Sequence, residues 1–194
     1  MPNTSATGGY LVPSTSAPPE DDAFENLIGG AISGIAGIDR ILVRPRWQAE
    51  PPPMPAIDVS WCAFGITEIV ADWSAATVHQ PAGDGSDEVT RHDTVRTLAS
   101  FYGPLGYSKA SQTRDGLWVL QNWETLREAG VALYEAGPIR TASDLINERF
   151  IRRIDIELVF RRAVTRTYPV LNLLSAQGSF RTDLGYVQPF TVEQ

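Results

Sequence analysis

The chain has few of the residues that build disulfide frameworks and metal centres. It contains one cysteine, Cys62, and two histidines, His79 and His92, in 194 residues. A single cysteine excludes an intramolecular disulfide framework, which fits a cytosolic or virion protein better than a small secreted one. Neither histidine has partners at metal-ligand spacing, so we predict no metal site. We interpret the histidines as structural or solvent-facing and Cys62 as a small apolar core residue.

The sequence also lacks a long apolar run and an excess of basic residues. The longest apolar stretch, 27–38, is broken by glycines and is shorter than the roughly 20 residues that a membrane-spanning helix needs. The formal net charge is -7, whereas nucleic-acid binding needs a basic face. We therefore predict no membrane partner and no specific nucleic-acid binding.

Catalytic motifs are absent too. The glycine-rich segment 27–34 has neither the glycine order nor the lysine and hydroxyl pair of a phosphate loop. The acidic segment 84–88 lacks the ligand spacing of a calcium loop. There is no nucleophile elbow, and no spacing pairs two carboxylates in a cleft. We predict no catalytic, cofactor-binding or metal-binding residues, and no enzymatic activity.

A proline-rich segment, 44–55, is the most informative feature that is present. Proline lacks a backbone N–H and restricts the residue before it, so this segment is neither a helix nor a central strand. We expect an ordered extended segment between two structured halves. It carries Arg44, Arg46 and Trp47, and arginine and tryptophan are frequent hot-spot residues of interfaces. The alternative is that Trp47 covers the protein's own core.

Apolar spacing predicts two main helices, 22–37 and 107–129, with glycine stops at Gly37 and Gly130. Glycines inside the first helix lower its propensity, and they are tolerated where another backbone approaches closely: Gly29, Gly30 and Gly34.

Strands are predicted at 38–44, 57–70, 89–102, 131–135 and 149–168, with loops at 73–88 and 137–143 and a possible edge strand from residue 171. The segment 149–168 gives the cleanest alternation of apolar and charged residues. The predicted class is α+β, a mostly antiparallel sheet with the two main helices packed on one face. We expect a flexible N-terminal arm at 1–19, one α+β domain at 20–176 and a C-terminal extension at 177–194.

Arginines of the segment 149–168 are candidate interface residues, because arginine pairs with carboxylates and is enriched at interfaces. Arg152 and Arg162 fall in the mostly apolar register, so we expect them at strand ends or against a partner. The alternative is a solvated charged strand face. The candidate interface residues are Arg44, Arg46, Trp47, Glu148, Arg149, Arg152, Arg153, Arg161 and Arg162, and Arg166 belongs to the same arginine set.

An ordered set of motifs resembles the bacteriophage neck or tail terminator family, the tail completion proteins of tailed phages and prophages. The resemblance covers about residues 38–176. The motifs are Arg44-Pro45-Arg46-Trp47-Gln48 with Glu50-Pro51-Pro52-Pro53, Trp61 with Phe64-Gly65-Ile66, His79 with Pro81-Ala82-Gly83-Asp84-Gly85 and Arg91-His92, Phe101-Tyr102-Gly103-Pro104, Arg114-Asp115-Gly116-Leu117, Asn147-Glu148-Arg149-Phe150, Arg152-Arg153-Ile154-Asp155, Arg166-Thr167-Tyr168 and Asn172-Leu173-Leu174-Ser175.

This resemblance implies a structural virion protein with a tail-terminator-like α+β fold, assembled in the bacterial cytoplasm. It implies a homo-oligomeric ring, expected to be a hexamer, at the head-proximal end of the tail tube. The ring would end tube polymerisation and join the tail to the head connector. Its partners would be other copies of itself, the tail tube protein and the connector or neck proteins. The family offers no catalytic residues or cofactors.

Three other readings stay open on the sequence. A baseplate or hub-proximal tail protein would share the virion class but act at the other end of the tail. A hydrolase or binding enzyme of an α+β type would need a converging His/Asp or carboxylate pair in a pocket. A nucleic-acid-binding module that uses the strand arginines would show salt-dependent retention on DNA.

Overall fold

The computed structural model describes residues 2–16, 18–146 and 149–193, which divide into two compact units. The larger unit comprises residues 18–75 and 90–165, and the smaller unit comprises residues 2–16, 76–89 and 166–193. The hydrophobic core of the described residues lies in the larger unit.

A mostly antiparallel sheet organises the fold, in the order β1-β2-β4-β7-β5. Strand β1 runs parallel to β2, whereas β2 pairs with β4 and both β5 and β6 pair with β7 in antiparallel fashion. Strand β3 pairs with β4. The bounds are β1 Val43–Pro45, β2 Trp61–Ala71, β3 Ala76–Gln80, β4 Ser86–Tyr102, β5 Val131–Ala136, β6 Arg140–Ile146 and β7 Arg149–Tyr168.

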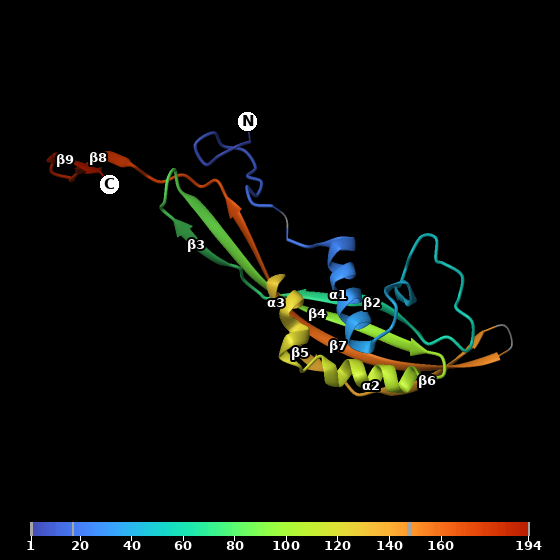
Figure 1. The fold of residues 1–194 in the computed structure, drawn as a ribbon. Coiled ribbons are helices and arrows are strands. Elements are labelled where there is room, and N and C mark those ends of the chain that lie inside the picture. Colours follow the sequence, from blue (N-terminus) through green and yellow to red (C-terminus); the bar gives the residue numbers. More distant parts are fainter. Residues whose placement is uncertain (1, 17, 147–148, 194) are drawn as a thin grey trace. The chain divides into compact units, whose positions relative to one another are not determined.

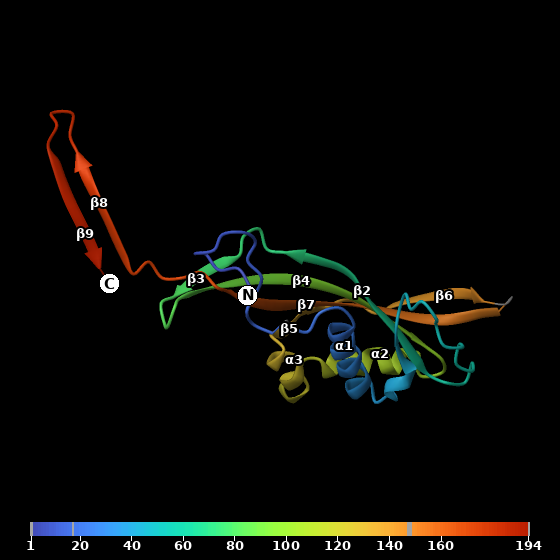
Figure 2. The ribbon, with the colours of Figure 1, turned by 90° about the horizontal axis from the view of Figure 1, so that it is seen from above.

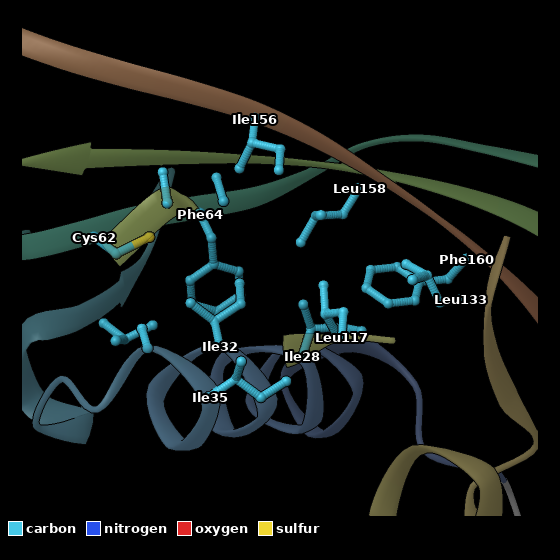
Figure 3. Packing of buried hydrophobic residues seen from close by; sticks show 14 of the residues in the cluster. Ile28, Ile32, Ile35, Cys62, Phe64, Leu117, Leu133, Ile156, Leu158 and Phe160 are labelled. Carbon is cyan, nitrogen blue, oxygen red and sulfur yellow. The ribbon is translucent and has the colours of Figure 1, made fainter. Parts of the chain in front are cut away.

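Three α-helices pack on one face of the sheet in the larger unit (Figures 1 and 2). They are α1 Asp21–Ala36, α2 Gly106–Gly116 and α3 Glu124–Glu128, with 3-10 turns η1 Arg40–Leu42 and η2 Leu120–Trp123. Figure 3 shows side chains of α1 directed at the sheet, where Ile28 and Ile32 meet Phe64 and Leu158. The predicted α+β class is therefore confirmed. Within the described part of the chain, every helix is too short or too polar to cross a membrane.

Helix α1 follows the predicted helix 22–37 closely. Asp21 and Asp22 lie in its first turn, where the positive end of the helix dipole favours them. Gly37 ends the helix with φ 59°, and its N–H donates to the carbonyl of Ser33. This left-handed conformation suits glycine, so the predicted stop is confirmed.

The predicted close approach of another backbone to the glycines of α1 is wrong, because side chains approach one of them and, among the described residues, nothing approaches the other two. A Cβ on Gly29 would lie 2.7 Å from the ring of Phe64, so this glycine lets the helix settle on the sheet. Gly30 and Gly34 face open space instead.

The predicted second helix, 107–129, is wrong in its middle. Helix α2 ends at Gly116, and η2 and the short α3 follow it. At this break, two side chains donate hydrogen bonds to the backbone carbonyls that a continuous helix would otherwise satisfy. Nδ2 of Asn122 donates to the carbonyl of Gly116 at 2.8 Å, and the indole of Trp123 donates to the carbonyl of Leu117. Because these carbonyls are satisfied locally, the chain turns without a continuous helix.

Several predicted strand limits are corrected as well. The segment 38–44 is mostly not a strand, because the carboxylate of Asp39 accepts from the N–H of Ile41 at 3.1 Å and starts η1. The predicted strand 57–70 begins four residues late, after a turn in which the N–H of Val59 donates to Ala56 at 2.9 Å. The predicted strand 149–168 is confirmed over its full length as β7.

The two predicted loops contain strands. Strand β3 lies within 73–88, and the predicted tip of that loop joins β3 to β4. Strand β6 replaces most of 137–143, because β7 is long enough to pair with two strands in succession. The N–H of Gly137 donates to the carbonyl of Glu157 at 2.8 Å, which marks the kink between β5 and β6.

The smaller unit holds β3, the first residues of β4, the end of β7 and a hairpin of β8 Ser175–Arg181 and β9 Val187–Glu193. The predicted edge strand after residue 171 is therefore wrong, because β8 and β9 form a separate two-stranded sheet. Residues 2–16 contain turns but neither helix nor strand. The N–H groups of Ser5 and Ser14 donate to the carbonyls of Pro169 and Thr167.

Candidate interaction surface

The sheet face opposite the helices carries a row of polar side chains in the larger unit. Strand β7 places Ile154, Ile156 and Leu158 in the core, so its odd-numbered residues point to the other face. We call this opposite side the open face. Across it, Arg96 of β4 pairs with Glu157 of β7 at 2.9 Å and with Glu68 of β2 at 3.0 Å. Two further sets of linked side chains lie on the same face.

One linked set joins four elements at the centre of the open face. The guanidinium of Arg153 lies 2.7 Å from the carboxylate of Asp144 and 3.0 Å from that of Asp155. The fully buried hydroxyl of Ser100 donates to Asp155 and accepts from Arg46. Arg46 is thereby tied to β4 and β7, which fixes the start of the proline-rich segment on the sheet.

Aromatic side chains extend this set. The rings of Trp61 and Tyr102 stack with centroids 4.4 Å apart, and the guanidinium of Arg44 lies 5.8 Å from the Trp61 ring. Arg44 also donates to the carbonyl of Pro53 at 2.7 Å, so it holds the far end of the proline-rich segment. Burial raises the pKa of Tyr102, and the nearby carboxylate of Asp144 raises it further.

A second linked set lies further along the open face. Arg161 binds the carboxylate of Asp72 through two hydrogen bonds of 3.0 and 2.8 Å, and it donates to the hydroxyl of Thr94 at 2.7 Å. The hydrogen bond from Arg161 holds the pKa of Asp72 below its usual value. Such bidentate pairs are the geometrically specific form of the arginine–carboxylate contact.

Trp47 stands at the edge of the open face and is 71% exposed. Its ring rests on Gly65, where a Cβ would lie 2.6 Å from the ring. One side of the indole therefore packs against its own chain, and the rest is open to solvent. A groove of about 490 Å³ runs beside it, lined chiefly by Arg44, Trp47, Pro51, Pro52, Met54 and Trp61. The proline-rich segment past Pro45 has no helix or strand, as predicted.

Arg152 and Arg162 share the helix-side register of β7 but have different surroundings. Arg162 is only 4% exposed, because its guanidinium lies 4.4 Å from the ring centroid of Phe24 and donates to the carbonyl of Pro19. Arg152 is exposed and forms no ion pair with any residue that the structure describes. The partner expected for Arg162 is thus within its own chain.

The remaining candidate residues are less fully defined. Glu148 lies outside the described residues. Arg149 pairs with Ile146 through the backbone of the β6–β7 hairpin. Arg166 lies on the part of β7 that belongs to the smaller unit. In residues 2–16, 18–146 and 149–193, no three His, Cys, Asp or Glu side chains group as a metal site.

Two features escaped the sequence reasoning. Leu145 and Phe150 face each other across the β6–β7 hairpin, and both are exposed. A groove of about 780 Å³ lies between the start of α1, the second half of β2 and Trp47. The first feature could be predicted from the length of the strand 149–168. A strand this long is longer than the sheet face that the predicted helices can cover.

Comparison with known proteins gives two findings. A sequence model of the family described as phage neck terminator protein matches residues 22–183. A segment of 75 residues is 35% identical to a protein of Enterococcus faecalis described as an amino-acid racemase. That second match covers 34% of this chain and 10% of the other protein, so the chain spans about a tenth of that relative's length.

The family match covers most of the chain and includes α1, the proline-rich segment, the whole larger unit from residue 22 and strand β8. The short second match extends over too little of either protein to indicate a shared activity. The family is one of structural proteins, and the resemblance seen in the sequence motifs is confirmed. The chain belongs to the phage neck terminator protein family.

Proposed function

We propose that this protein forms a ring at the head-proximal end of a phage tail tube, where it ends tube polymerisation and joins the tail to the head connector. The family match over residues 22–183 is the observation that carries this proposal, because it supports a structural role in the phage tail. The protein acts without catalysis or cofactor, as part of the virion.

The partners in this proposal are other copies of the chain, the tail tube protein and the connector or neck proteins. A hexamer is the ring size that we propose. A closed ring requires a heterologous contact, in which two different surfaces of one subunit meet those of its neighbours. The open face and the exposed side of Trp47 supply surfaces of the mixed aromatic and arginine composition that interfaces favour.

The proposed capping mechanism is geometric. The ring occupies the binding edge of the last tube ring and presents no identical edge outward, so no further tube subunit can add. Arg44, Arg46 and Trp47 belong to this docking surface in our proposal. Arg46 is fixed to Ser100 and Arg44 to Pro53, so the surface is preorganised and binding orders few additional groups.

Purified protein added to polymerising tail tube protein tests the proposal. We expect tubes that become shorter as the ratio of this protein to tube protein rises, measured by electron microscopy. The variant Trp47→Ala is expected to weaken this effect. Trp118→Ala is the matched control, because Trp118 is also exposed but lies beyond the end of α2 on the helix side. A final tube length that excess wild-type protein leaves unchanged would contradict the proposal.

A further inference from the structure

Two surfaces of the larger unit have complementary chemical composition. The first is the groove of about 780 Å³ beside α1, which we call the α1 groove. The second is the helix-side surface of the β6–β7 hairpin, formed by Leu145, Phe150 and Arg152, which we call the hairpin surface. Both belong to the same unit, so every copy of the chain carries one of each.

The α1 groove combines an apolar strip with an acidic rim. Ile66 and Ile69 of β2 form the strip, Phe24 is buried beneath Arg162, and Trp47 stands at one end. Asp21, Asp22 and Glu25 line it from the first turns of α1, and among the described residues none of these three forms an ion pair. Burial raises the pKa of Glu25, and the charge of Asp22 raises it further.

The cations of the α1 groove are already engaged within the chain. Arg162 stacks on Phe24 and donates to Pro19, and Arg46 donates to Ser100. The remaining negative charge of the rim is therefore not neutralised by any arginine that the structure describes. An occupant with an apolar tip and an adjacent positive charge would complement the groove.

The hairpin surface has that composition. Leu145 and Phe150 are directly paired across the strands and are 64% and 76% exposed. Arg152 is the next residue in the same register, and no described residue pairs with its charge. Figures 1 and 2 show the paired ends of β6 and β7 extending past the helices, so no helix covers this part of the strand face.

We propose that the hairpin surface of one copy docks in the α1 groove of a second copy. Leu145 and Phe150 lie against Ile66 and Ile69 of the neighbour, and Arg152 pairs with the acidic rim. Because the two surfaces differ, the contact is heterologous and repeats from subunit to subunit until the ring closes. This inference rests on the proposed ring, and it identifies the two surfaces that build it.

The test measures self-association by analytical ultracentrifugation of the full chain. Phe150→Asp damages the hairpin surface and Asp22→Arg damages the α1 groove. Each variant alone is expected to weaken self-association at least tenfold. Tyr134→Asp and Glu128→Arg are the matched controls, because both residues are exposed in the larger unit away from the two surfaces. Circular dichroism of each variant checks that the fold is retained.

Mixing the two variants gives a sharper result. The Asp22→Arg chain keeps an intact hairpin surface and the Phe150→Asp chain keeps an intact groove. One undamaged contact can therefore form between them, and we expect dimers that grow no further. Higher salt is expected to weaken the wild-type assembly, since the contact includes exposed charges.

Three outcomes overturn the inference. They are a wild-type chain that stays monomeric at millimolar concentration, variants that associate as tightly as the wild type, and a mixture that gives no dimers. A fourth outcome also overturns it: if the Asp22→Arg chain still forms rings but no longer binds tube ends, the groove binds a different virion protein. The tube-length assay judges the capping function separately, so the two proposals can fail independently.

Discussion

Gly29 and Gly30 are neighbours in α1 with opposite surroundings. A Cβ on Gly29 would lie 2.7 Å from Phe64, whereas one on Gly30 meets nothing within 4 Å. We predict that Gly29→Ala lowers the free energy of unfolding by about 1–3 kcal/mol, because it overpacks the core. Gly30→Ala is predicted to raise it by about 0.5–1 kcal/mol, because alanine is the better helix former.

Urea denaturation of the wild type, Gly29→Ala and Gly30→Ala measures both changes. Gly34→Ala is a second control, because a Cβ at Gly34 also meets nothing within 4 Å. Equal effects of the substitutions at positions 29 and 30 would show that α1 does not rest on the sheet through Gly29.

His79 lies between two hydrogen-bond acceptors in the smaller unit. Its Nδ1 is 2.7 Å from the carboxylate of Asp87, and its Nε2 is 2.9 Å from Oδ1 of Asn172. Nδ2 of Asn172 donates to the carbonyls of Pro81 and Gly83, so its oxygen faces the histidine. Both ring nitrogens therefore donate, which favours the protonated imidazole. The structural role predicted for this histidine agrees with these contacts.

The hydrogen bond to Asp87, with a further contribution from Asn172, raises the pKa of His79 above 6.5. We predict that NMR titration finds this increase and that Asp87→Asn reduces it, whereas the control Asp84→Asn does not. The sign follows from linkage. The stabilising contribution is complete below pH 6.5 and is lost as the pH rises through the higher folded value. An unshifted titration in the wild type would contradict this arrangement.

At the scale of elements, the β8–β9 hairpin forms a two-stranded sheet of its own within the smaller unit. Phe180 and Phe190 stack with centroids 5.0 Å apart, but most of the hairpin is exposed. Two-stranded hairpins are marginal in water on their own. We predict that removing residues 175–194 changes the free energy of unfolding of the larger unit by less than about 0.5 kcal/mol, as for exposed surface changes.

Thermal unfolding followed by tryptophan fluorescence measures that effect, because all five tryptophans precede the deletion. Removal of the single residue Gln194 is a suitable control truncation. A large loss of stability in the longer truncation would mean that the hairpin packs on the core in solution.

Strand β7 and helix α1 could be predicted because the spacing of their apolar residues fits only one type of secondary structure. The alternation of Ile154, Ile156 and Leu158 with charged residues fits a strand only. The break after α2 could not be predicted in this way. Leu117, Leu120 and Trp123 are spaced by three residues, which suits a 3-10 turn as well as an α-helix. The side-chain contacts of Asn122 and Trp123 decide between them.

The candidate surface could be predicted only in part. The sequence predicts Arg44, Arg46 and Trp47 as candidates because the proline-rich segment marks its own conformation, and the structure leaves Trp47 exposed. Arg152 and Arg162 have the same register in β7, and the sequence could not show that one is buried against Phe24. Strand β6 was missed because its pairing depends on the length of β7, a distant partner, rather than on its own residues.

At the scale of the whole molecule, the family match and the surface chemistry of the larger unit lead to the same proposal. A sheet with one face covered by helices and the other bearing linked arginines and carboxylates offers two chemically distinct sides. A terminator needs such asymmetry, because the surface that meets the tube must differ from the surface turned toward the head.

Electron microscopy of phage particles produced without this protein tests that proposal most directly. The account predicts overlong or ragged tails that are not attached to filled heads, and their correction by the wild-type chain supplied in trans. Particles that lack tails altogether would place the protein at the baseplate side. Normal infectious particles with tails of the usual length would contradict the terminator function.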